Sequence, residues 1–166
     1  MAVSSEEFKK ALQHWASGVA VVTSKSDQFG LRGMTVTAFS SVSVEPPQIL
    51  VCLNKSADTG ENIDLNGRFA VNILNTDQQN VSNNFSGGSS QEDRFANTRW
   101  SMGATDVPIL DESIMSLECK VVEKVGAGTH WVVIGEIEAI TCREGEPLLY
   151  FRSNYRQLAD LPAATE

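Results

Sequence analysis

Residues 33–54, GMTVTAFSSVSVEPPQILVCLN, decide the fold, because they hold two alternating apolar runs on either side of a proline pair. The runs at 40–45 and 48–54 are rich in valine, isoleucine and leucine, which suit a pleated, half-buried surface. Pro46 and Pro47 lack backbone donors, so the hydrogen-bonded ladder is interrupted between the runs. We therefore expect two strands of one sheet that bends or turns at the prolines.

The segment ahead of the first strand has the composition of a wall for a flat, polar ring. Gly33 and Ala38 carry little or no side chain, so a ligand can approach the backbone closely. Small hydroxyls are concentrated in the same segment, at Thr35, Thr37, Ser40 and Ser41. These residues predict a binding wall for a polar heteroaromatic ring.

A possible phosphate loop follows the second strand directly. Lys55, Ser56 and Thr59 supply one cation, two hydroxyls and loop amides, a set that can hold a phosphate. The alternative is an ordinary polar turn. In the phosphate interpretation, the ring wall and the phosphate loop are neighbours.

Composition predicts one globular domain over residues 1–166, with 42% hydrophobic and 20% charged residues. The net charge of -8 disfavours contact with nucleic acid or an anionic membrane. An anionic ligand must then be held by local donors, of which Lys55 is the first candidate.

The cysteines and the N-terminus point to a cytoplasmic protein. Cys52, Cys119 and Cys142 are widely separated and show no Cys-x-x-Cys spacing, so they fit neither a disulfide framework nor a metal site. The N-terminal residues contain no apolar signal region, and no run approaches the length of a membrane span. We expect free thiols, no metal and no membrane association.

The remaining pattern alternates strands with a few short helices. A Ser-x-x-Glu capping box at Ser4 predicts an amphipathic helix over residues 5–17, which Gly18 ends. Residues 100–111 are expected to be irregular because Pro108 is a breaker. Further strands are expected at 19–23, 29–34, 68–75, 114–125, 130–141 and 147–151, and helical turns at 61–66 and 77–85. Many strands without a βαβ rhythm favour a closed or partly closed antiparallel barrel.

The sequence resembles the flavin reductase-like family, the small reductase components of two-component flavin monooxygenases. The resemblance is carried by the stretch from Gly33 to Thr59 and by three further motifs: RFAVNIL at 68–74, GTHWVVIGEIEAI at 128–140 and PLLYFRSNYRQL at 147–158. It implies a mainly β fold, an antiparallel split β-barrel with a few flanking helices. It also implies binding of FMN or FAD, hydride transfer from NADH or NADPH to the flavin, and a homodimer.

The resemblance places His130 near the open face of the flavin, where it would act catalytically by orienting the nicotinamide or assisting proton movement. Without the resemblance, His130 reads as a hydrogen-bonded residue at a strand start. The cofactor-binding residues expected are Gly33, Met34, Thr35, Val36, Thr37, Ala38, Ser40, Ser41, Leu53, Asn54, Lys55, Ser56, Thr59, Arg94, Tyr155 and Arg156.

Several of these roles have plainer alternatives. Arg94 resembles a residue at the edge of the cofactor site, but a surface ion pair explains it equally simply. Tyr155 and Arg156 either contact the nicotinamide nucleotide or form a solvated capping strand. The segment with His14, Trp15, Ser17 and Gly18 corresponds to a family segment near the nicotinamide nucleotide, or else forms a helix cap and core contact.

Hydride transfer between a nicotinamide and a flavin uses reactivity that both cofactors already possess, so no protein nucleophile is required. The leading hypothesis is therefore an NAD(P)H:flavin oxidoreductase that releases reduced flavin to a separate monooxygenase. The alternatives are an FMN-binding electron-transfer module of the same barrel, and an oxidase of the pyridoxamine phosphate type. The motifs at 33–54 and 128–136 favour the reductase over the oxidase.

Overall fold

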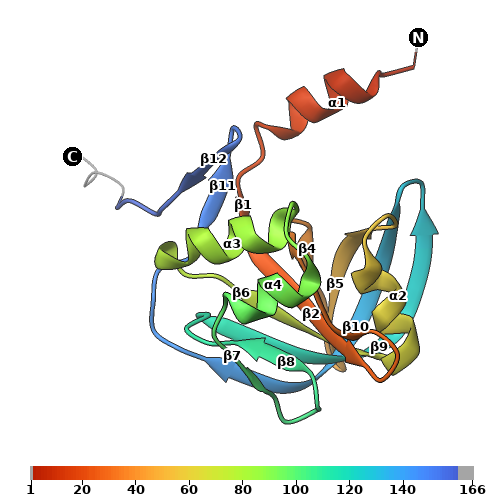
Figure 1. Ribbon diagram of the computed structural model, residues 1–166. Helices are drawn as coiled ribbons and strands as arrows, with labels where there is room; N and C mark the ends of the chain where they lie inside the picture. The colour runs from red at the N-terminus through yellow and green to blue at the C-terminus, as the bar shows by residue number, and fades with distance from the viewer. Residues whose placement is uncertain (1, 161–166) are drawn as a thin grey trace.

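Figure 1 shows the computed structural model of the chain, which describes residues 2–160. The single domain expected over residues 1–166 therefore has Met1 and residues 161–166 outside the described part. Within residues 2–160, no helix has the length and apolar character needed to cross a membrane.

An antiparallel sheet of seven strands forms most of the molecule, in the order β3-β2-β6-β9-β10-β5-β4. This confirms the expected mainly β, antiparallel architecture with a few helices. The strands are β2 (Ala20–Ser26), β3 (Gly30–Val36), β4 (Phe39–Val44), β5 (Pro47–Asn54), β6 (Arg68–Ile73), β9 (Met115–Ala127) and β10 (His130–Cys142).

Smaller elements surround this sheet (Figure 1). The helices are α1 (Ser5–Leu12), α2 (Asp58–Asn66), α3 (Gln79–Ser86) and α4 (Gln91–Ala96), with a single 3₁₀ turn at Thr76–Gln78. A second sheet has the order β1-β11-β12, from β1 (Ser17–Gly18), β11 (Leu149–Phe151) and β12 (Asn154–Arg156). A third sheet pairs β7 (Trp100–Met102) with β8 (Pro108–Leu110).

The proline pair makes the hairpin expected from the sequence. Val44 at the end of β4 lies opposite Pro47 at the start of β5, so the chain reverses between them. The peptide bond between Glu45 and Pro46 is cis. Pro47 is tolerated because it is the first residue of its strand, where a missing donor does least harm.

The long β9–β10 hairpin is also confirmed. His130 pairs with Ala127 across a tight turn, and Gly128 in that turn has φ +56, a left-handed conformation that glycine adopts without strain. On its other side, β10 pairs with β5, with His130 opposite Asn54. The start of β10 and the end of β5 are thereby fixed side by side.

Strand β2 is buried on both faces along most of its length, and its first three residues, Ala20 to Val22, are all apolar. Ala20 and Val22 belong to one core cluster, together with Phe69 and Leu53. Val21 faces the opposite way, into a second cluster. The second cluster includes Phe85 of α3 and Phe95 of α4, so these two helices cover the outer face of β2 and β3 (Figure 1).

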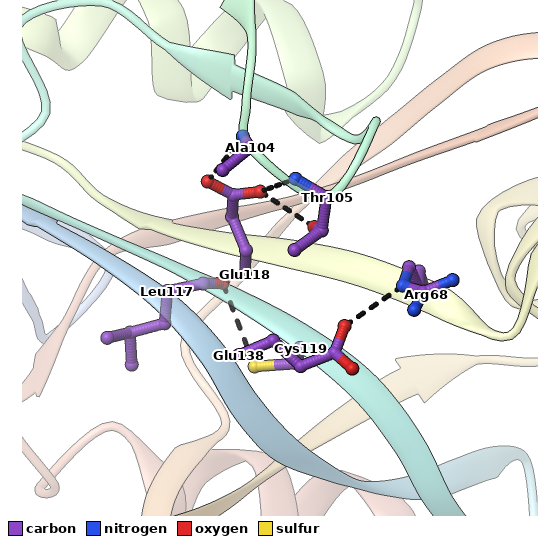
Figure 2. A network of polar contacts seen from close by, with 7 residues as sticks. All are labelled: Arg68, Ala104, Thr105, Leu117, Glu118, Cys119 and Glu138. Atoms are coloured by element: carbon purple, nitrogen blue, oxygen red, sulfur yellow. Dashed lines mark hydrogen bonds and ion pairs between the residues drawn. The ribbon is translucent and has the colours of Figure 1, made fainter.

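Residues 100–111 are not irregular as expected, because they form the β7–β8 hairpin. The connecting loop is held by Glu118 of β9, which is 3% exposed (Figure 2). The Glu118 carboxylate accepts hydrogen bonds from the Ala104 amide at 3.1 Å, the Thr105 amide at 2.7 Å and the Thr105 hydroxyl at 2.7 Å. Pro108 does not break the structure here, because it occupies the first position of β8.

Helix α1 is shorter than expected, since it ends at Leu12 rather than near Ser17. The capping box is present: the Ser4 hydroxyl accepts from the Glu7 amide, and the Glu7 carboxylate accepts from the Ser4 amide. Nevertheless α1 has no buried residue, and it projects away from the rest of the chain (Figure 1). Its apolar face, with Phe8 and Leu12 exposed, has no partner among residues 2–160.

Candidate functional site

A hollow of about 270 Å³ lies where β3, β5 and β10 come together. Its wall is the end of β3 and the residues after it, the segment expected to hold a flat ring. The floor comes from the paired ends of β5 and β10. The lining residues are Met34, Thr35, Val36, Thr37, Ala38, Cys52, Asn54 and His130.

His130 is exposed at the rim of this hollow, as the first residue of β10. Its Nδ1 atom lies 2.9 Å from the Thr129 hydroxyl, in hydrogen-bond contact. This contact restrains the imidazole and leaves Nε2 available to a ligand. A histidine held through one ring nitrogen and open at the other is suited to donate or accept one hydrogen bond.

The turn after β5 is tightly built around Asn54. The Asn54 side-chain oxygen accepts from both the amide and the hydroxyl of Ser56, each at 3.0 Å. The Lys55 amide donates to the Thr129 carbonyl at 3.0 Å, which ties this turn to the turn before His130. The expected neighbours Asn54, Lys55 and Ser56 therefore lie beside His130, held there by strand pairing and by this backbone hydrogen bond.

Lys55 carries a positive charge at this turn. Its ammonium lies 4.6 Å from the centre of the Trp131 ring, and it forms no ion pair with an acidic residue among residues 2–160. Its side chain is exposed, so an anion can reach it from solvent. This is the property that the sequence predicted for a phosphate-binding cation.

Thr59 is placed differently from its neighbours in the loop. It lies in the first turn of α2 and is fully buried, and its hydroxyl has no hydrogen-bond partner in the structure. The N-cap residue of α2, Ala57, supplies no side-chain hydrogen bond to the helix amides. The start of α2 therefore keeps amide donors that side chains do not satisfy, next to the Lys55 turn.

Gly33 does not leave room for a ligand, contrary to expectation. A Cβ atom at this position would lie 2.7 Å from the Phe85 ring, so α3 already fills the space. Both backbone polar groups of Gly33 are also engaged: its amide donates to Gln91 at 2.9 Å and its carbonyl accepts from Arg94 at 2.9 Å. The glycine is required for packing of α3 and α4 against β3.

Arg94 forms no ion pair within residues 2–160, so the surface ion pair considered from the sequence is absent there. It donates to the Gly33 carbonyl and so fixes the edge strand β3 immediately before Met34. Burial lowers the pKa of the Arg94 guanidinium, and the nearby Asp58 carboxylate opposes that shift. Arg94 thus supports the backbone of β3, and its guanidinium is close enough to Asp58, in the first turn of α2, for the two charges to interact.

Three other expected residues do not reach the hollow with their side chains. Leu53 is fully buried in the main core cluster. Ser40 and Ser41 are exposed on the edge strand β4, and the Ser40 hydroxyl donates to the Ser41 carbonyl. The alternation of β5 explains the contrast, because Cys52 and Asn54 face the hollow while Leu53 faces the core.

The C-terminal hairpin lies on the other side of Thr37. The Tyr155 hydroxyl lies 2.9 Å from the Ser82 hydroxyl and 2.8 Å from the Asn83 side-chain oxygen, so Tyr155 is held against α3. It lines a second hollow together with Thr35 and Thr37. Arg156 lies in a separate depression with Thr76, Gln79, Leu148, Tyr155 and Gln157, away from His130.

A third hollow, of about 340 Å³, lies between α1 and the β11–β12 turn and shares Thr37 and Ala38 with the first. Trp15 and Ser17, from the segment noted in the sequence, line it, whereas His14 and Gly18 do not. The remaining lining residues are Lys9, Leu12, Gln13, Tyr150, Phe151, Arg152 and Ser153.

Tyr150 and Arg152, which line the third hollow, belong to the C-terminal aromatic and basic segment that the family resemblance implies closes over the cofactors, whereas Cys52 was not among the expected residues. Period-2 alternation from Asn54 was the available signal for Cys52. Arg152 occupies the β11–β12 turn with φ +51, without the glycine or asparagine that usually marks such a turn.

The residues present fit a flavin nucleotide. The first hollow offers backbone and hydroxyl groups along one wall and a histidine at its rim, which suits a flat polar ring. The Lys55 turn and the uncapped start of α2 provide a cation and amide donors for a phosphate. The three hollows meet at Thr37, so a second, elongated ligand can reach the first.

Comparison with known proteins gives a consistent result. The family described as flavin reductase like domain matches residues 12–159. FMN reductase (NADH) RutF from Pseudomonas syringae pv. syringae (strain B728a) is 39% identical over 165 residues, which cover 98% of this chain and 92% of that protein.

Two solved structures are similar throughout. A putative flavin reductase from Haemophilus somnus 129PT has a TM-score of 0.90 at 33% identity, covering 94% of this chain and 100% of that one. BorF, the flavin reductase component of a bacterial two-component tryptophan halogenase, has a TM-score of 0.86 at 28% identity, covering 95% and 100%.

Proposed function

Because the chain belongs to the flavin reductase like domain family, we propose that it is an NAD(P)H:flavin oxidoreductase that reduces FMN or FAD and supplies reduced flavin to a separate monooxygenase. The observation that carries this proposal is the hollow that joins His130 to residues 34–38 and adjoins the Lys55 turn. The hollow provides a wall for the ring and a histidine at its rim, and the adjoining turn is suited to a phosphate. Backbone pairing connects all three.

The protein's part in the reaction is binding and orientation. When bound, the nicotinamide and the flavin exchange a hydride by their own chemistry. The backbone and hydroxyl groups of residues 34–38 hold the flavin ring, and the Lys55 ammonium with the first amides of α2 holds its phosphate. Hydride transfer needs no nucleophilic side chain. A site built of hydroxyls, amides and one histidine is therefore sufficient for it.

His130 orients the nicotinamide. Its Nδ1 atom is engaged by Thr129, so Nε2 is the atom directed to the hydride donor or to a proton in transit. The pairing of His130 with Asn54 fixes this group relative to the phosphate turn. The relative named FMN reductase (NADH) supports NADH and FMN as the first pair to test.

The quaternary structure and barrel form are part of the proposal. We infer a split barrel in which the seven-stranded sheet curves around the main core cluster, and a homodimer that covers the apolar face of α1. Support for the dimer comes from α1 itself: an isolated helix of this length is marginal in water, and Trp15 next to it is 73% exposed. The three free thiols support a reducing, cytoplasmic location.

Delivery to a partner oxygenase is supported by the BorF resemblance, since BorF is one component of a two-component system. The hollows are open to solvent. A site of this kind suits a flavin that must leave after reduction.

The test is nicotinamide oxidation followed by its absorbance, with FMN, FAD or riboflavin added to the protein in turn and NADH or NADPH as donor. Oxidation of one nicotinamide that requires both protein and flavin supports the proposal and ranks the cofactors. Tight flavin binding without nicotinamide oxidation would instead favour the FMN-binding electron-transfer module.

A further inference from the structure

Trp131 lies between the two lysines nearest the phosphate turn. The Lys55 ammonium is 4.6 Å and the Lys124 ammonium 4.3 Å from the centre of its ring. The side chain of Trp131 is partly buried beside the main core cluster. Two ammonium groups near one indole in a chain of net charge -8 call for an explanation.

The two lysines are in different electrostatic states. The Lys124 ammonium donates to the Asp64 carboxylate at 2.6 Å and to the Gly60 carbonyl at 3.0 Å, and its side chain is only 12% exposed. Lys124 is therefore neutralised and committed to α2. Lys55 has no ion-pair partner among residues 2–160, so its only charge-selective contact in the structure is the face of Trp131.

Two glycines provide the space in which the indole lies. A Cβ atom on Gly126 would lie 3.1 Å from the Trp131 ring and 3.3 Å from the Lys55 ammonium. A Cβ atom on Gly60 would lie 3.2 Å from the other side of the indole, at Cδ1. The ring is thus confined between β9 and the first turn of α2, which makes it a fixed surface rather than a mobile one.

We propose that Trp131 is a positioning residue that holds the Lys55 ammonium at the turn where the flavin phosphate binds. This inference rests on the proposed function. A free lysine side chain has many accessible rotamers, and a long exposed side chain must be ordered before it can contact a phosphate. Contact with the ring restricts Lys55 beforehand and leaves its charge uncompensated, so the ammonium remains available to an anion.

The test compares FMN with riboflavin, which has the same ring system and no phosphate. Dissociation constants for both are measured with wild-type protein and with Trp131→Leu, Trp131→Phe and Lys124→Gln. Because exposed cation–π contacts contribute about 0.5–1 kcal/mol, Trp131→Leu should weaken FMN binding about 2- to 5-fold and leave riboflavin binding unchanged. Trp131→Phe keeps an aromatic face and should retain most of the FMN preference.

Lys124→Gln is the matched control, since it removes an ammonium from the same ring but one already paired with Asp64. It should leave the ratio of FMN to riboflavin affinity unchanged. In a Lys55→Gln background, Trp131→Leu should have no further effect on FMN binding, because the two residues act through one contact.

Equal weakening of FMN and riboflavin by Trp131→Leu would overturn the inference, because it would show a general loss of structure. An unchanged FMN affinity in Trp131→Leu, or equal affinity of the wild type for FMN and riboflavin, would also overturn it. Failure of the proposed function gives a different result: the wild-type protein would bind neither flavin.

Discussion

Replacing His130 by alanine should reduce kcat/KM for the nicotinamide and leave flavin affinity nearly unchanged. The structure limits the size of the effect. His130 is exposed, and with Nδ1 in contact with Thr129 it has one ring nitrogen, Nε2, to offer a ligand. One hydrogen bond of this kind contributes about 0.5–1.5 kcal/mol, which corresponds to about a 2- to 13-fold loss in kcat/KM.

The contact between the Thr129 hydroxyl and His130 can also be removed by itself, with a smaller expected effect on kcat/KM. Thr129→Val removes the hydroxyl that contacts Nδ1 and keeps the imidazole, so its loss in kcat/KM should be smaller than that of His130→Ala. Thr129→Ser retains the hydroxyl and serves as the control with wild-type kinetics. The assay is steady-state oxidation of the nicotinamide at saturating flavin, paired with a flavin titration of each variant.

Two results would refute this reasoning. Unaltered kcat and KM in His130→Ala would return His130 to a structural residue at a strand start. An equal loss of flavin affinity would mean that the substitution distorts the hollow as a whole, since the pairing of His130 with Asn54 joins two of its walls.

Three further predictions concern packing and the buried groups. Gly33→Ala should cost about 1–3 kcal/mol and lower Tm in thermal unfolding by about 2–12 °C, because the added methyl meets the Phe85 ring; an unchanged Tm would show that the ring can move aside. Glu118→Ala leaves the amides of the 103–106 loop without their acceptor and should cost about 2–6 kcal/mol in urea unfolding, with Glu118→Gln losing less; equal stability of both variants and wild type would contradict this. Burial, with the Glu118 and Glu138 charges, raises the pKa of the Cys119 thiol from 9.0 to about 12, so its contribution to stability is complete below pH 9 and lost as pH rises towards 12. Cys119→Ala should therefore flatten the alkaline loss of stability, and an unchanged alkaline profile would count against it.

The strand pairs with strong local signals were predictable from the sequence. The proline pair fixed the β4–β5 turn because proline has no amide to give to a ladder. Gly128 marked the β9–β10 turn because its φ of +56 suits glycine. The pairing of β5 with β10, which places His130 beside Asn54, joins strands far apart in the chain, and neither turn signals it; before the structure, only the family resemblance placed His130 near the flavin site.

The elements that were missed lack such signals. β7, β8 and β12 are three residues each, too short for alternation to show. The β11–β12 turn uses Arg152 and Ser153 in the left-handed region, where sequence rules expect glycine or asparagine. Their pairing depends on tertiary contacts, such as that between Tyr155 and Ser82.

The orientation of side chains at the site was not readable from the sequence. Gly33 has the composition of a ligand-approach residue, but the space beside it belongs to Phe85, about fifty residues later in the chain. Leu53 lies next to Asn54 in sequence and faces the opposite side of the sheet. Thr59 is carried into the interior by the first turn of α2. Local sequence identifies the segment, and only the packed structure decides which atoms of it remain accessible.

The measurement that tests the central claim most directly is an anaerobic mixing experiment with protein, NADH and FMN, in which both absorbances are followed together. The account predicts that the flavin band bleaches as NADH is consumed, one flavin reduced for each nicotinamide oxidised, at a rate proportional to protein concentration and slowed in His130→Ala. Bleaching at the same rate with and without protein would contradict it.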